Sequence, residues 1–311
     1  MIRRLILLFL LITFSVIIVL VLVHESDIQK RELQFFNGGL ILIGDLYIPK
    51  QITSKTGIVF LHGSLPEGRK LLLYKTLCER LASNGYVVFS FDQRGYGDSE
   101  DPEKISSVAE LDFVSDAEQA VTVFLEQSLK YGVQSVALIG HSFGGGVAVA
   151  AGVKSSKVSK IVSISPGRRI SSRFFGNNAT DDLQYVQERK SNDMRLTEMI
   201  PIEVVKPMLD LYNVEQFRGV TFQKPLLLIE GSEEPLEDLA FTKKFVSTLG
   251  GPVFHIVINS AAHYFGTRKS KLWKFWRWRV EDRGVINKLV NTIDNWINDT
   301  PDSLKIKAKQ E

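Results

Sequence analysis

Short apolar runs alternate with helix-like segments through most of this 311-residue chain. The runs at 58–61, 87–91 and 136–139 have the length and branching of buried strands. Between two of them, apolar residues recur at helical spacing from Leu111 to Leu125. Such alternation is typical of a mostly parallel sheet with helices on both faces, so the sequence predicts an α/β fold.

The pattern also predicts where the elements lie. A hairpin is expected from 33–36 and 40–48, joined across Asn37-Gly38-Gly39. Further strands are expected at 58–61, 87–91, 136–139, 160–165, 225–229 and 253–258, and helices near 71–82, 111–125, 145–151, 239–249 and 285–297. The alternation lapses from about 167 to 219, and this segment is predicted to be a lid insertion. We therefore expect one globular domain at 25–299, followed by a tail at 300–311.

The first 24 residues differ from the rest. Residues 5–23 contain no charged residue, and a helix of that length spans about 28 Å, close to the roughly 30 Å of a bilayer core. The small residues of a signal-peptide cleavage site are absent before His24, so residues 1–24 are predicted to be an uncleaved transmembrane anchor. Arg3 and Arg4 precede the run, which predicts a cytoplasmic N-terminus and a globular domain on the exterior or periplasmic side.

Composition excludes some classes of protein. Lysine and arginine number 38 against 35 acidic residues, so the charge gives no indication of nucleic-acid binding. The single cysteine, Cys78, rules out an internal disulfide framework and is expected on the buried face of a helix. No cluster has metal-ligand spacing, and Gly95-Tyr96-Gly97 lacks the strand-to-helix context of a phosphate-binding loop. Neither a metal nor a cofactor is expected.

A serine between two glycines follows the predicted strand at 136–139. The pentapeptide is Gly140-His141-Ser142-Phe143-Gly144, and small residues that suit a closely packed helix come after it. Such a pentapeptide also occurs in ordinary glycine-serine turns, but the strand before it and the helix after it favour a nucleophile elbow. In an elbow the serine backbone is strained and its hydroxyl projects above the sheet, beside the positive end of the next helix. Ser142 is thus a candidate nucleophile.

A serine hydroxyl needs a base, because it is a poor nucleophile at neutral pH. Of the five histidines, only His263 follows a late predicted strand, which is the position expected when the chain order is serine, acid, histidine. The alternative is that His263 is a surface residue of a polar loop. The others lie beside the anchor, in tight turns or within a predicted strand (His24, His62, His141 and His255).

The chain resembles the α/β-hydrolase superfamily from about Glu32 to Asn298. The resemblance depends on motifs in the expected order: His62-Gly63, Asp92 to Ser99, the elbow, Gly231 to Glu234, and His263. Among the branches of this superfamily, the chain looks most like serine-aminopeptidase-like and esterase-like lipolytic enzymes. The resemblance implies an α/β-hydrolase fold with a helical lid.

The resemblance also implies an acid three residues after Gly231, at Glu234, which would orient the histidine. The commoner pattern has aspartate at this point, and a glutamate is longer by one methylene. Three neighbouring acids remain alternatives, namely Glu233, Glu237 and Asp238. An acidic start of a helix, without a catalytic role, is the simplest alternative.

Two backbone N–H groups are expected to bind the oxyanion of the tetrahedral intermediate. One belongs to Phe143, directly after the nucleophile. The family motif implies that the other belongs to Ser64, in the loop His62-Gly63-Ser64-Leu65-Pro66. The competing interpretation of His62-Gly63 is a tight turn closed by a side-chain hydrogen bond.

Two charged segments are assigned no catalytic role. Asp92 and Arg94 are expected to brace neighbouring loops. Residues 269–283 interleave aromatic residues with cations, which suits a lipid interface or an anionic partner but equally suits packing onto the sheet.

These features together predict a membrane-anchored serine hydrolase. It would cleave a carboxylic ester through an acyl-enzyme on Ser142, and a thioester or amide is a less favoured substrate. An aminopeptidase-like amide hydrolase acting on a peptide-like substrate is one alternative. The other is a non-catalytic binding protein that has kept the fold.

Overall fold

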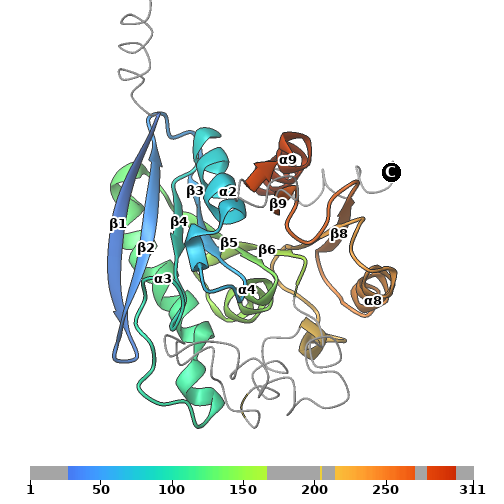
Figure 1. Cartoon of the computed structure of the whole chain (residues 1–311), viewed down its shortest axis with the longest axis horizontal. Coiled ribbons are helices and arrows are strands. Elements are labelled where there is room, and N and C mark those ends of the chain that lie inside the picture. The colour runs from blue at the N-terminus through green and yellow to red at the C-terminus, as the bar shows by residue number, and fades with distance from the viewer. Residues whose placement is uncertain (1–26, 167–203, 205–213, 270–278, 299–311) are drawn as a thin grey trace, which may run out of the picture.

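The computed structural model of the chain describes residues 27–166, 204, 214–269 and 279–298. Figure 1 shows a central sheet with helices packed on both sides. The predicted anchor at 1–24, the tail at 300–311 and most of the predicted lid at 167–219 lie outside the described residues.

Eight strands form the main sheet, in the order β1-β2-β4-β3-β5-β6-β7-β8. Their bounds are β1 Ile28–Asn37, β2 Leu40–Pro49, β3 Thr56–Leu61, β4 Val88–Phe91, β5 Ser135–His141, β6 Val158–Ile164, β7 Leu226–Gly231 and β8 Val253–Ile258. The first hairpin and the β2-β4 pair are antiparallel, and every neighbouring pair from β4 to β8 is parallel. The predicted α/β fold class is confirmed.

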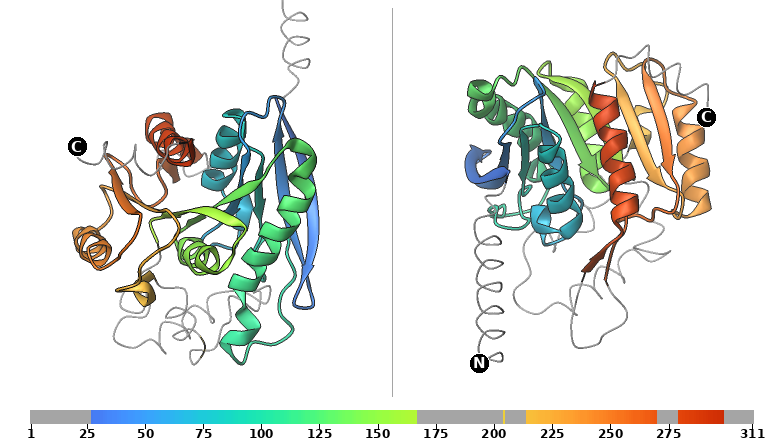
Figure 2. Two further views of the ribbon diagram at one scale, coloured as in Figure 1. Left: turned by 180° about the vertical axis from the view of Figure 1, so that it is seen from behind. Right: turned by 90° about the horizontal axis from the view of Figure 1, so that it is seen from above.

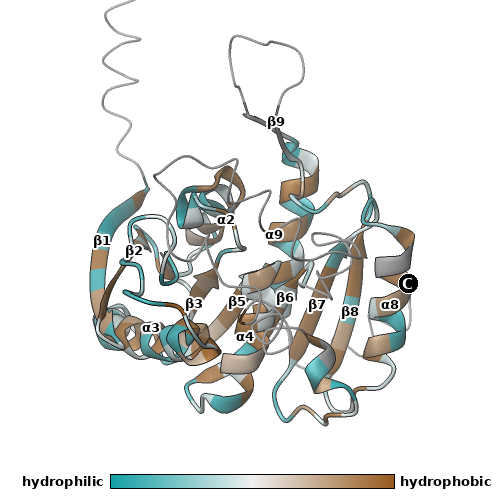
Figure 3. Ribbon diagram, turned by 60° about the horizontal axis from the view of Figure 1, so that its bottom comes forward, coloured by the Kyte–Doolittle hydropathy of each residue, from teal (hydrophilic) through white to brown (hydrophobic). Residues whose placement is uncertain are grey.

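The main helices cover both faces of the sheet, as Figure 2 shows from two further directions. Their bounds are α2 Leu72–Ser83, α3 Phe113–Ser128, α4 Phe143–Lys154, α8 Leu236–Val246 and α9 Arg283–Asn298, with short 3-10 helices η1 Gly68–Lys70, η2 Val108–Leu111, η3 Leu129–Tyr131 and η5 Val214–Phe217. One core cluster contains residues of α3, α4 and α8, and the other contains residues of α2 and α9. The strands at the centre of the sheet are largely brown in Figure 3, because both of their faces are covered.

Cys78 on α2 has no exposed surface and is unpaired. It belongs to the cluster between α2, α9 and the sheet. The expectation of a buried helix position is therefore confirmed. Burial raises the pKa of its thiol.

Several element boundaries differ from the sequence prediction. Helix α8 begins at Leu236 rather than Leu239, because Pro235 occupies its N-cap position and leaves the helix free to start directly after it. The short strands β9 Thr267–Lys269 and β10 Arg279–Glu281 were not predicted, and they pair antiparallel at the two ends of the aromatic and basic segment. Three residues are too few to show an alternating pattern.

Two features are absent from the described part of the chain. Among these residues, none of the helices combines the length and hydropathy needed to cross a bilayer. Nor does the described part contain a group of three or more side chains able to hold a metal ion.

The parallel strands end at one edge of the sheet, and this edge positions the site. His141 at the end of β5 pairs with Ile164 at the end of β6, and Gly231 at the end of β7 pairs with Ile258 at the end of β8. The loops after these strands therefore meet. In α/β sheets this carboxyl edge is where ligands bind.

Candidate active site

Ser142 lies in the sharp turn between β5 and α4. Its φ of 54° and ψ of −122° are a strained combination for a residue with a side chain. A Cβ atom on Gly144 would collide with the carbonyl oxygen of His62, so this position requires glycine. Ser142 is half-buried, and the turn holds it at the carboxyl edge of the sheet. This is the geometry of a nucleophile elbow.

Three predicted side chains meet beyond this turn. Nε2 of His263 lies 3.2 Å from Oγ of Ser142, and Nδ1 of His263 lies 2.9 Å from Oε1 of Glu234. Because a carboxylate can only accept a hydrogen bond, Nδ1–H of His263 donates to Glu234. Nε2 of His263 then carries no proton and accepts the hydrogen bond of the serine hydroxyl. The Glu234 side chain is 9% exposed and that of His263 is 37% exposed. The arrangement places a base against the hydroxyl and an acid behind the base.

Hydrogen bonds join the loop after β7, residues 232–235, to the loop after β8, residues 259–266, which we call the histidine loop. The N–H of Glu233 donates to the carbonyl oxygen of Ala261 at 2.8 Å, and the N–H of Ser260 donates to Oγ of Ser232 at 2.9 Å. These bonds hold Glu234 where its longer side chain reaches the imidazole.

Of the three rival acids, the structure describes the side chain of Glu233. Glu233 is exposed, whereas Oε1 of Glu234 lies 2.9 Å from Nδ1 of His263. Glu237 and Asp238 lie on the first turn of α8, and their side chains are outside what the structure describes.

The two residues predicted to supply the oxyanion donors, Phe143 and Ser64, each lie next to a residue at the turn or beside it. We call residues 62–66 the oxyanion loop. A Cβ atom on Gly63 would be 3.2 Å from Cβ of Ser142, so this loop passes directly beside the nucleophile, and Ser64 follows as an exposed residue. Phe143 is the first residue of α4, where helical N–H groups and the helix dipole favour negative charge.

His62 is a structural residue of this loop. Its Nδ1 lies 2.6 Å from the carbonyl oxygen of Gly63, and its Nε2 accepts the N–H of Gln93 at 2.9 Å. Both ring nitrogens are thus used by the backbone. Burial lowers the pKa of His62 and keeps the ring neutral.

Buried ion pairs brace the loops behind the site. Arg69 is buried and contacts Asp92, and it also binds Asp45 at 2.9 Å and Asp98 at 3.0 Å. Arg94 binds Asp116 through two hydrogen bonds of 2.7 Å. The expectation that Asp92 and Arg94 brace loops agrees with these contacts.

Two residues near the site were missed by sequence reasoning. His141 was treated as part of a tight turn, but it ends β5 as a fully buried residue whose Nε2 lies 2.8 Å from the carbonyl oxygen of His263. Oη of Tyr74 on α2 lies 3.0 Å from Nδ1 of His141. A tyrosine at helical spacing is indistinguishable in sequence from an ordinary core aromatic residue, so no signal pointed to this contact.

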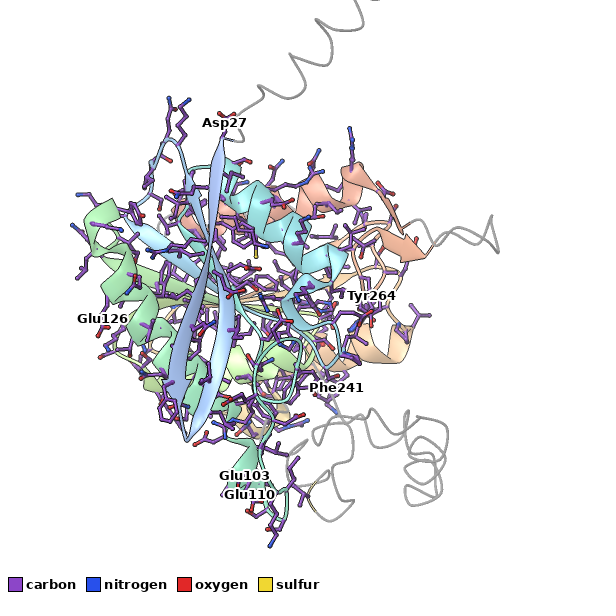
Figure 4. The ribbon with its side chains drawn as sticks, turned by 60° about the vertical axis from the view of Figure 1, so that its left-hand side comes forward. Asp27, Glu103, Glu110, Glu126, Phe241 and Tyr264 are labelled. Carbon is purple, nitrogen blue, oxygen red and sulfur yellow. The ribbon has the colours of Figure 1, made fainter. Side chains whose placement is uncertain are left out.

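Apolar or aromatic residues lie close in sequence to Ser142, His263 and Glu234. Tyr264, labelled in Figure 4, follows His263, packs edge-on against it and is 38% exposed. Leu236, two residues after Glu234, is 83% exposed. On the other side of Ser142, Phe143 packs edge-on against Phe113 at a centroid distance of 5.1 Å.

Two described residues of the predicted lid are buried. Val204 and Val214 belong to the core cluster that also contains Phe143. These two residues of the segment therefore pack into the core of the domain.

The chain is similar to known proteins in part of its sequence and in its fold. Residues 53–180 match the family model described as serine aminopeptidase, S33. No curated protein sequence matches the chain.

Solved structures share the architecture at low sequence identity. A soluble variant of monoglyceride lipase from Saccharomyces cerevisiae has a TM-score of 0.60 at 13% identity, over 89% of this chain and 97% of that one. Dienelactone hydrolase from Anabaena variabilis has a TM-score of 0.52 at 18% identity, over 87% and 97%. An esterase from Pyrococcus furiosus has a TM-score of 0.52 at 18% identity, over 75% and 82%. At such identities the likeness concerns the fold.

Proposed function

Because the chain has the α/β-hydrolase fold, we propose that it is a serine hydrolase that cleaves a carboxylic ester through an acyl-enzyme on Ser142. The observation that carries this proposal is the 3.2 Å separation between Nε2 of His263 and Oγ of Ser142. This distance lies at the limit of direct proton transfer between the two groups.

The first half of the reaction forms the acyl-enzyme. Nε2 of His263 takes the hydroxyl proton as Oγ of Ser142 attacks the ester carbonyl carbon, and the carbonyl oxygen becomes an oxyanion. Glu234 stabilises the imidazolium through the hydrogen bond at Nδ1. The tetrahedral intermediate collapses when His263 returns the proton to the leaving alcohol.

The second half releases the acid. A water molecule gives one proton to His263 and attacks the acyl carbon, and the serine is regenerated when its oxygen is reprotonated. In both halves the oxyanion needs two donors, for which we propose the backbone N–H groups of Phe143 and Ser64.

Ester cleavage is favoured over amide cleavage by the named structural relatives. A lipase, an esterase and a dienelactone hydrolase act on esters by their names. The match to the serine aminopeptidase model supports an amide-cleaving alternative. A non-catalytic role would leave the alignment of Ser142, His263 and Glu234 without a purpose.

We also retain the proposal that residues 1–24 anchor the protein in a membrane, with the N-terminus cytoplasmic and the hydrolase domain on the exterior or periplasmic side. It is supported by the uncharged run at 5–23 and the preceding arginines.

The decisive experiment is Ser142→Ala, tested with short p-nitrophenyl esters and a fluorophosphonate probe. Loss of both turnover and labelling is expected, because the nucleophilic oxygen is removed. Ser135→Ala is the matched control, since Ser135 lies at the opposite end of the same strand. If Ser142→Ala is labelled as fast as wild type, Ser142 is not the nucleophile. A panel of aminoacyl amides and thioesters then distinguishes the substrate classes.

A further inference from the structure

A chain of hydrogen bonds joins the oxyanion loop to the histidine loop through the interior. The N–H of Gly63 donates to Oη of Tyr74 at 2.8 Å, and Oη of Tyr74 lies 3.0 Å from Nδ1 of His141. Nε2 of His141 lies 2.8 Å from the carbonyl oxygen of His263. Two side chains thus connect two backbone segments that each lie close to Ser142.

Each donor in this chain is determined by its partner. The carbonyl oxygen of His263 can only accept, so Nε2 of His141 carries the proton. Nδ1 of the neutral ring is then an acceptor, and the Tyr74 hydroxyl donates to it. The oxygen of Tyr74 remains free to accept the N–H of Gly63. Any other tautomer of His141 would place a lone pair against the carbonyl oxygen.

Burial keeps both side chains uncharged. His141 has no exposed surface, and burial together with the neighbouring His263 lowers the pKa of His141 to about 3. Burial raises the pKa of Tyr74, which is 1% exposed. The imidazole rings of His141 and His263 are only 4.8 Å apart. A neutral His141 therefore adds no charge that would oppose protonation of His263.

We propose that Tyr74 and His141 are positioning residues that hold the oxyanion loop and the histidine loop in register with Ser142. The inference rests on the proposed hydrolase function. His141 directly precedes Ser142, so the nucleophile shares a backbone segment with the centre of the link. Catalysis needs the base and the oxyanion donors held within a fraction of an ångström, and buried hydrogen bonds from neighbouring residues provide such support.

The first test is Tyr74→Phe, which removes the hydroxyl but keeps the ring. We expect kcat for a p-nitrophenyl ester to fall about tenfold while KM stays within about twofold, because misplacement affects the transition state more than binding. The matched control is Tyr86→Phe. Tyr86 is also buried and donates to Asp294 at 2.6 Å, and it lies just before β4, at the edge of the sheet opposite to Ser142. An equal kcat for the two variants would overturn the proposal.

The second test changes His141. Glutamine keeps one acceptor and one donor at the end of the side chain, whereas leucine keeps neither. We expect His141→Gln to retain kcat within about threefold and His141→Leu to lose at least as much as Tyr74→Phe. If leucine and glutamine behave alike while both variants stay folded, the hydrogen bonds do not position the site.

The third test requires no turnover. Nitrogen-15 NMR of histidine-labelled wild-type protein, assigned by the signals missing in His141→Gln, is expected to show a neutral Nε2–H tautomer for His141 from pH 5 to 8. A titrating signal, or an Nδ1–H tautomer, would overturn the link even in an active enzyme. An inactive wild type with the expected tautomer would instead contradict the proposed hydrolase function.

Discussion

A side chain at Gly140 would collide with the carbonyl oxygen of Gly144, across the turn that carries Ser142. The two glycines thus let the strand and the helix approach each other. Gly140→Ala is expected to lower the free energy of unfolding by about 2 kcal/mol through overpacking and to reduce kcat by about 100-fold through displacement of Ser142. Urea unfolding and initial rates with a p-nitrophenyl ester measure the two effects.

The control for this change is Gly132→Ala. Gly132 has a positive φ, of 79°, which Gly140 lacks, but a Cβ atom there would meet nothing within 4 Å. Backbone strain of about 1 kcal/mol is expected without loss of kcat. If Gly140→Ala keeps wild-type kcat, close packing at the elbow is not needed for catalysis.

Glu234→Gln tests which acid orients the histidine. An amide can donate to Nδ1 and stabilise the wrong tautomer, so kcat is expected to fall by about 10³-fold to 10⁴-fold. Glu233→Gln removes the same charge from an exposed neighbour and is expected to change kcat less than threefold, or roughly 0.6 kcal/mol in activation energy. Steady-state kinetics of the two variants decide between them. Comparable losses would assign the role to neither acid alone.

His141 makes stability depend on pH. Its pKa is about 3 in the folded protein, against about 6.5 in the unfolded chain, so the unfolded state binds more protons between these values. Stability therefore falls as pH decreases through that range and is constant above it. From pH 7 to pH 5, wild type should lose about 2 kcal/mol more free energy of unfolding than His141→Gln.

Urea unfolding of both proteins at the two pH values measures this difference. The lowered pKa of His62 contributes in both proteins and cancels in the comparison. Parallel pH profiles for wild type and His141→Gln would show that His141 is not kept neutral by the fold.

Deletion of residues 1–24 tests the anchor. Strand β1 begins only at Ile28, so the deletion leaves every described element intact. The shortened protein is expected in the supernatant after carbonate extraction of membranes, with ester hydrolysis unchanged. The full-length protein is the control and should remain in the pellet. If the shortened protein also remains in the pellet, residues 1–24 are not the membrane anchor, and residues 269–283 become the candidate membrane-binding segment.

Local patterns were enough to predict the sheet and the order of its strands along the chain. Each of the runs at 58–61, 136–139 and 225–229 is continuously apolar because the strand is covered on both faces, and such runs are visible without a structure. Ser142 could be chosen as the candidate nucleophile and His263 as the candidate base because each follows the end of a predicted strand. The family resemblance suggested Glu234. In the structure Glu234 lies within hydrogen-bond distance of His263, and His263 lies within hydrogen-bond distance of Ser142.

The contacts around the triad could not be predicted in the same way. Tyr74 and His141 are separated by 67 residues, and the sequence does not show that α2 brings the phenol to the end of β5. The same is true of Arg69, whose partners come from β2 and from the loop after β4. Such pairs depend on how elements pack, which short-range periodicity does not encode.

The burial of Cys78 has a practical consequence for spectroscopy. It is the one cysteine of the chain, and its thiol is both inaccessible and held protonated. A maleimide dye or nitroxide label would therefore react only with a second thiol introduced at a chosen surface position. Movements of the loops around Ser142 can then be followed from a single attached reporter, without first replacing the native cysteine.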